Sequence, residues 1–217
     1  MPDRLKPASA CPPSRGPRRW HGLPALALSA LAGLAAAALP SVAEAHVLGG
    51  PMGGFGSGFG HPLAGFDHFL AMLAVGLWGA QMGGRAVWSL PATFPLIMCI
   101  GGVAGMLGLM PDETIRIAIA LSLVVLGGVI AARWVAPEWA ALLIVATFAI
   151  FHGYPHGQLT LRAVDPAAFT VGFVVSTGAI HILGIAVGLG LNRVWGGNLV
   201  RALGAAIVLA GIYFLLR

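Results

Sequence analysis

Charged residues are scarce in this chain: they make up 9% of its 217 residues, while 58% are hydrophobic. A soluble domain carries about a quarter charged residues, so the composition excludes a water-soluble globular protein. Beyond residue 45 the chain has no lysine, and its seven arginines are set against five acidic residues. The body of the chain is therefore nearly neutral despite a formal net charge of +5, and we expect no nucleic-acid binding.

Cysteines are also rare, and the motifs of several enzyme classes are missing. Cys11 and Cys99 form neither a CxxC pair nor a disulfide framework. The sequence has no GxxxxGK(S/T) phosphate loop, so direct use of ATP would need a partner, and it has no HExxH zinc-protease motif. Ser176 and His181 are five residues apart on one apolar segment, which is a poor spacing for a nucleophile and its base. We expect no enzymatic activity and no prosthetic group.

The N-terminal region has the pattern of a secretory signal peptide. Residues 1–22 are basic and proline-rich, residues 23–39 are apolar, and Ala43-Glu44-Ala45 follows a helix-breaking Pro40. We expect cleavage after residue 45, which would leave His46 as the N-terminal residue. The alternative is an uncleaved first helix. Residues 46–62 would then form a glycine-rich outer segment, and GGPMGGFGSGFG at 49–60 is typical of flexible chain.

Six apolar stretches follow, and each is close to the ~20 residues that cross a bilayer. They lie near 63–82, 87–109, 115–134, 138–154, 167–190 and 198–216. The sequence therefore predicts an all-α, polytopic six-helix membrane bundle over residues 63–217. Three small-xxx-small pairs would let helices approach closely, within the chain or in a homo-oligomer. These pairs are Gly79/Gly83, Gly101/Gly105 and Gly184/Gly188.

The arginines and the leader predict the same orientation in a bacterial inner membrane. With the mature N-terminus in the periplasm, four arginines fall on the inner side, namely Arg85, Arg133, Arg193 and Arg201. Three fall on the outer side together with nearby acids, namely Arg116, Arg162 and Arg217. The excess of arginine inside is small, but it agrees with the positive-inside rule.

The first group of metal-ligating residues lies at the start of the first span. His61 and His68 are seven residues apart and would share a helix face, and Met72 lies one turn beyond His68. Pro62 suits a first helical turn. Asp67 would point away from that face, either as a ligand or as the partner that orients an imidazole. Imidazole with carboxylate suits nickel, cobalt, zinc or copper(II). The alternative is a helix cap with two interfacial histidines.

Two further elements carry histidine. In FHGYPHG, His152 and His156 are four residues apart, but Gly153, Pro155 and Gly157 argue against a regular helix and favour broken backbone lining a cavity. The alternative is a helix end whose histidines lie in a loop. His181 lies deep in the fifth span, about one turn after a Ser-Thr pair, where it would serve as a relay for metal or protons, or would simply bond to another helix.

These residues resemble the HupE/UreJ family of hydrogenase- and urease-associated nickel permeases. The family signature HPxxGxDHxLxMxxVG reads HPLAGFDHFLAMLAVG at 61–76, and FHGxAHG reads FHGYPHG at 151–157, followed by Gln158 where the family often has glutamate. The resemblance covers roughly 46–217. It implies a permease for nickel, or for cobalt, that serves metalloenzyme maturation. The implied residues are His46 for capture, His61, Asp67 and His68 as the core motif, and His152, His156 and His181 along the path.

A second reading of the same residues is a membrane chaperone or sensor for hydrogenase or urease assembly, which holds the metal without translocating it. The predicted position of His46, His61 and His68 on the outer side suits this function. The expected partners in both cases are a divalent metal ion and the lipid bilayer.

Overall fold

The computed structural model describes residues 54–195 and 197–217, and this part of the chain is helical without a strand. Its elements are α2 (Gly54–Ala64), α3 (Phe66–Met82), α4 (Ala86–Met106), α5 (Asp112–Ala131), α6 (Glu138–Thr160), α7 (Pro166–Trp195) and α8 (Asn198–Leu216). The predicted signal peptide and His46 lie outside the described residues. Helices α4 to α8 are each long and apolar enough to cross a membrane, and α2 with α3 makes a sixth span if the bent pair counts as one. The predicted all-α polytopic bundle is confirmed.

The first predicted span is two helices instead of one. Helices α2 and α3 meet at an angle of 80° at Gly65, which adopts an extended conformation between them. The prediction of a flexible segment was wrong for residues 54–60, because these form most of α2 and pack against α7. Gly58 and Gly172 lie in this contact, and a Cβ at either position would collide with the backbone of the other helix. Pro62 accordingly lies near the end of α2 and not in the first turn of a span.

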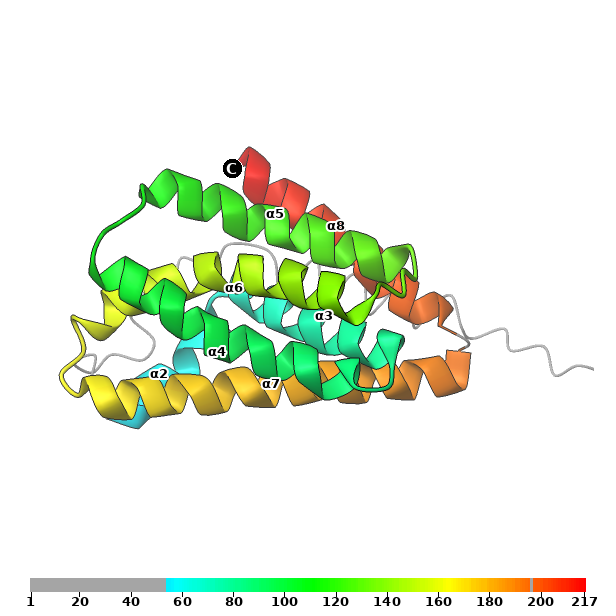
Figure 1. Cartoon of the computed structure of the whole chain (residues 1–217), viewed down its shortest axis with the longest axis horizontal. Coiled ribbons are helices and arrows are strands. Elements are labelled where there is room, and N and C mark those ends of the chain that lie inside the picture. Colours follow the sequence, from blue (N-terminus) through cyan, green and yellow to red (C-terminus); the bar gives the residue numbers. More distant parts are fainter. Residues whose placement is uncertain (1–53, 196) are drawn as a thin grey trace, which may run out of the picture.

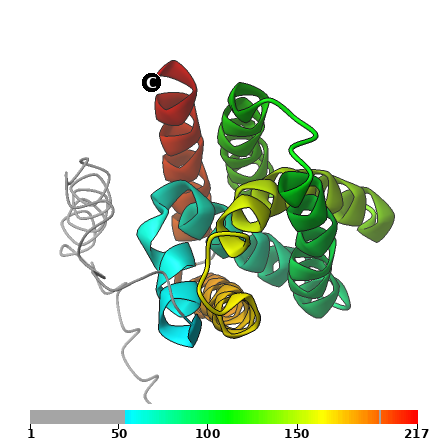
Figure 2. The same cartoon turned by 90° about the vertical axis from the view of Figure 1, so that its left-hand side faces the viewer.

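Helix α3 is the centre of the bundle. Figure 1 shows α5 and α8 together on one side and α2 and α7 together on the other, and Figure 2 looks along the bundle with α3 in the middle. All seven residues from 74 to 80 are buried, as expected for a helix surrounded by others. Lipid is as apolar as the side chains, so close van der Waals packing between helices stabilises such a bundle more than the hydrophobic effect does.

Helix α6 is continuous through FHGYPHG, so the prediction of a broken backbone there was wrong. Pro155 removes one backbone donor near the C-terminal end of the helix, which runs on to Thr160. Gly153 and Gly157 face α4 so closely that a Cβ on them would strike the backbone of Met98 and Gly102. The two glycines therefore serve helix packing, and they bring the neighbouring histidines of α6 into the bundle.

Two of the three small-residue pairs also allow close contact between helices of this chain. Gly101 and Gly105 contact α6, and Gly184 and Gly188 contact α3. In the third pair, Gly79 packs against the start of α4, while Gly83 ends α3 with a positive φ of 71°. The homo-oligomer expected from these faces stays a prediction.

Candidate metal-binding site

Four histidines from three helices meet inside the bundle. His61 comes from the last turn of α2, His68 from the first turn of α3, and His152 and His156 from α6. The ring centroids of His68 lie 4.8 Å from His152 and 4.9 Å from His156, and those of His61 and His156 lie 5.1 Å apart. We call these four residues the imidazole cluster. The two motifs that are separate in the sequence thus form a single site.

Asp67 fixes the orientation of His68. The Nδ1 of His68 lies 2.8 Å from Oδ1 of Asp67. A carboxylate only accepts hydrogen bonds, so Nδ1 carries the proton and donates it. In a neutral imidazole the lone pair is then on Nε2, which is buried and has no hydrogen-bond partner in the described part of the chain. Carboxylates orient metal-binding histidines in this way, so of the two roles expected for Asp67 the geometry supports the orienting one.

Ser122 of α5 fixes the orientation of His152. Its Oγ donates to the carbonyl of Ile119 at 2.6 Å and lies 2.9 Å from Nε2 of His152. A hydroxyl has one proton, so the imidazole must donate in the second bond. The lone pair of His152 is consequently on Nδ1, which is buried and unpartnered among residues 54–195 and 197–217. Sequence reasoning missed Ser122; its one signal is a lone hydroxyl in the apolar run IAIALSLVVL.

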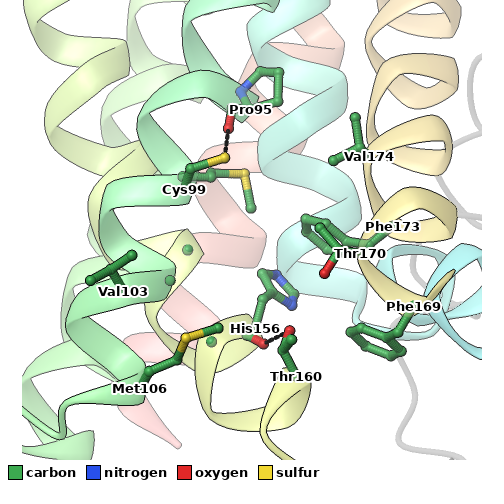
Figure 3. A pocket seen from close by; sticks show the side chains of 14 residues that line it. Pro95, Cys99, Val103, Met106, His156, Thr160, Phe169, Thr170, Phe173 and Val174 are labelled. Atoms are coloured by element: carbon green, nitrogen blue, oxygen red, sulfur yellow. Dashed lines mark hydrogen bonds between the residues drawn. The ribbon is translucent and has the colours of Figure 1, made fainter. Parts of the chain in front are cut away.

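His156 is the least constrained of the four. Both of its ring nitrogens are buried without a partner in the described structure, and its ring lies 4.1 Å from that of Phe173. It lines a largely apolar cavity of about 180 Å³ between α4, α6 and α7. Figure 3 shows its imidazole beside Phe173 and above Thr160, whose hydroxyl donates to the His156 carbonyl. Burial without hydrogen bonds is costly for an imidazole, so this side chain is suited to a polar ligand.

A second, more polar cavity reaches the site at Asp67. It measures about 240 Å³ and is also lined by Arg116, Ala120, Phe214 and Arg217. Arg116 pairs with Glu113 and donates to the carbonyl of Phe214, which ties α5 to the end of α8. Asp67 is the acidic group that the lining of this cavity offers to a hydrated cation, and Glu113 pairs with one of the two arginines that also line it.

The structure also describes Met72, Gln158 and His181. Met72 is fully buried in the main hydrophobic core. Gln158 donates to Asp112 at 3.4 Å. His181 of α7 is buried, and the ring of Phe94 lies 5.4 Å from that of His181 and 5.5 Å from that of His152. Phe94 is a second residue that sequence reasoning missed, because a phenylalanine in an apolar span carries no signal.

The described side chains are not arranged as a finished coordination sphere. Within residues 54–195 and 197–217, no group of three or more His, Cys, Asp or Glu residues could hold a metal ion as placed. The rings of His68 instead meet those of His152 and His156 edge to face, at 81° and 76°. The arrangement gathers neutral nitrogen donors in a buried space, and ligation would require their lone pairs to turn toward one point.

Comparison with known proteins agrees with the motifs. Residues 34–214 match the HupE / UreJ protein family. One curated relative, Protein HupE from Rhizobium leguminosarum bv. viciae, is 40% identical over 180 residues, which is 82% of this chain and 92% of the relative. No solved structure matches the chain. With the two histidine motifs joined in one cluster and a match over most of its length, the chain belongs to the HupE/UreJ family.

Proposed function

We propose that this protein is a secondary permease for a divalent transition metal, with nickel as the first cargo to test and cobalt as the second. It would serve the maturation of a metalloenzyme, since the HupE/UreJ family comprises hydrogenase and urease accessory proteins. The observation that carries the proposal is the pair of oriented histidines. Asp67 and Ser122 each bind one nitrogen of an imidazole and leave the other nitrogen buried with a free lone pair.

The donor set suits such a cargo. Neutral imidazole nitrogen is a ligand for nickel, cobalt, zinc and copper(II), whereas calcium and magnesium prefer oxygen. The cluster offers His68 Nε2, His152 Nδ1 and one of the two nitrogens of His156, neither of which is tied to a partner in the described part of the chain. Turning these rings toward a shared ion would replace their edge-to-face contacts with coordinate bonds, and it would satisfy nitrogens that are otherwise buried without partners.

The path would begin at the polar cavity beside Asp67 and continue through the cluster. The leader pattern and the arginine distribution support an orientation in which this end of the bundle faces the periplasm of a bacterial inner membrane. A membrane potential negative inside would then favour uptake by ~2.3 kcal/mol per charge for each 100 mV.

The test is metal flux into proteoliposomes that contain the full chain, with an inward-negative potential and a metal-sensitive dye inside. We expect wild-type protein to accumulate nickel and His68→Ala and His152→Ala to lose at least tenfold in initial rate. Thr147→Ala is the matched control, because Thr147 lies on α6 but is exposed on the outside of the bundle. It should transport like the wild type.

Two results would overturn the proposal. Nickel binding by the wild type without flux would show a chaperone that holds the metal and does not move it. Equal flux by wild type and both histidine variants would remove the cluster from the mechanism. Competition by cobalt and zinc in the same assay would rank the cargo ions, since geometry more than raw affinity decides among them.

A further inference from the structure

His181 stands in an environment of its own inside the bundle. It is 1% exposed, and neither of its ring nitrogens has a hydrogen-bond partner in the described part of the chain. Thr177 lies one helical turn earlier on α7 and Ser176 next to it, and the hydroxyls of both are likewise buried and unpartnered there. Three unsatisfied polar side chains within two turns of one helix are unusual, because each costs on the order of 1–3 kcal/mol when left unpaired.

Close packing holds this turn of α7 against the central helix. A Cβ on Gly76 of α3 would collide with the carbonyl of His181, and a Cβ on Gly184 of α7 would collide with that of Leu73. The two backbones therefore meet at the level of His181. The close backbone contact therefore fixes the turn of α7 that carries His181 against α3.

Phe94 of α4 contacts both His181 and a member of the imidazole cluster. Its ring centroid lies 5.4 Å from that of His181, nearly edge to face at 77°, and 5.5 Å from that of His152. A single, fully buried phenyl group is therefore in contact with both imidazoles.

The helix around Phe94 is weakened at the same place. Pro91 and Pro95 both lie inside α4, three residues before and one residue after Phe94. Each lacks a backbone N–H, so two of the hydrogen bonds that would stiffen this part of the helix are missing. The segment that carries Phe94 is therefore held by fewer backbone hydrogen bonds of its own than a helix without these prolines would have.

We infer that His181, with Thr177 one turn before it on the same helix face, forms a second, inner binding site for a divalent transition-metal ion, and that Phe94 separates this site from the imidazole cluster. The inference rests on the proposed function for the identity of the ion. A single imidazole with one hydroxyl would hold the ion together with part of its water shell, more weakly than the cluster. An ion at the inner site leaves through the cluster only after Phe94 has turned aside.

Binding stoichiometry tests the inner site without any transport. The full chain in nanodiscs is dialysed against nickel, and bound metal is counted by mass spectrometry. We expect two ions per wild-type chain and one per His181→Ala chain. His152→Ala, which disrupts the outer cluster, should also lose one ion but keep the one at His181. One ion in both wild type and His181→Ala would overturn the inner site.

Release kinetics test Phe94. After addition of a strong chelator, the wild type should lose nickel in a fast phase from the cluster and a slow phase from the inner site. His181→Ala should lack the slow phase, and Phe94→Ala should speed it at least tenfold. Leu90→Ala is the matched control, because Leu90 lies one turn earlier on α4 and is equally buried. It leaves a comparable cavity and should keep the wild-type slow phase.

The outcomes separate this inference from the proposed function. If the wild-type protein gives no nickel flux in proteoliposomes, the permease proposal is overturned. The number of nickel ions bound per chain still decides whether the inner site exists. A slow phase that Phe94→Ala leaves unchanged, or that Leu90→Ala accelerates equally, would overturn the role of Phe94. Phe94→Leu keeps a bulky apolar side chain at this position and should retain most of the slow phase. This variant separates the role of the side chain from a general loss of packing.

Discussion

Ser122 on α5 holds His152 on α6 through a bond of 2.9 Å between Oγ and Nε2. Ser122→Ala removes the acceptor, so the imidazole loses the partner that sets its protonation state and direction. We expect nickel affinity, measured by calorimetry on the full chain in detergent, to fall about tenfold, as for other partners of metal-binding histidines. Ser122→Thr keeps the hydroxyl and should stay within about threefold of wild type. Unchanged affinity in Ser122→Ala would contradict the orienting role.

Asp67 offers His68 both a hydrogen-bond acceptor and a negative charge, and two substitutions separate them. Asp67→Asn keeps an acceptor oxygen for the Nδ1–H of His68 but removes the charge, and Asp67→Ala removes both. We expect nickel affinity to decrease in the order wild type, Asp67→Asn, Asp67→Ala, with the alanine variant at least tenfold below wild type. Equal affinities in the two variants would mean that the charge alone matters and that the bond of 2.8 Å does not.

Gly153 allows α6 to touch α4, and a methyl group there has no room beside the backbone of Met98. Gly153→Ala should therefore destabilise the bundle by about 1–3 kcal/mol, the usual range for overpacking. Thermal unfolding in detergent would show a lower midpoint, with weaker nickel binding because the adjacent His152 moves with the helix. Gly178→Ala is the control, because a Cβ on Gly178 would meet no atom within 4 Å. A wild-type midpoint for Gly153→Ala would refute the close contact.

Tyr154 lies in the same heptapeptide as His152 and His156 but has a structural role. Its hydroxyl donates to the carbonyl of Met110 at 2.7 Å and accepts from the Met110 N–H at 3.1 Å, which fixes the connection between α4 and α5. Tyr154→Phe should lower the free energy of unfolding by about 1–3 kcal/mol, because polar groups of Met110 lose their partner. Nickel affinity should stay within about twofold of wild type. A large loss of affinity with normal stability would place Tyr154 in the metal site.

The spans after the first could be predicted from the sequence because hydropathy and length decide them. Each of α4 to α8 begins within three residues of the predicted start. The bend at Gly65 could not be predicted in this way, because GFGHPLAGFDHFL is apolar on both sides of the break and the break depends on α2 packing against α7. Hydropathy measures whether a segment can be in lipid, and it does not report where the segment changes direction.

The candidate site was likewise predictable only in part. The motifs identified His61, His68, His152 and His156, because histidine in an apolar segment is conspicuous. That these four histidines form one cluster could not be predicted from the sequence, because it depends on the tertiary structure. The bend between α2 and α3 is what brings His61 into contact with His156. Residues that act through these imidazoles are hidden in the sequence: a serine or a phenylalanine within a span is ordinary until its neighbours are known.

The bend between α2 and α3 also changes the distance that matters electrostatically. Helix α3 has 17 residues, so at ~1.5 Å per residue it extends about 25 Å, less than the ~30 Å of a hydrocarbon layer. With the C-terminal end of α3 at one edge of that layer, a cation bound at its first turn would lie inside the layer and not at its opposite edge. The apolar barrier left to cross would then be thinner than the bilayer, because of the bend alone.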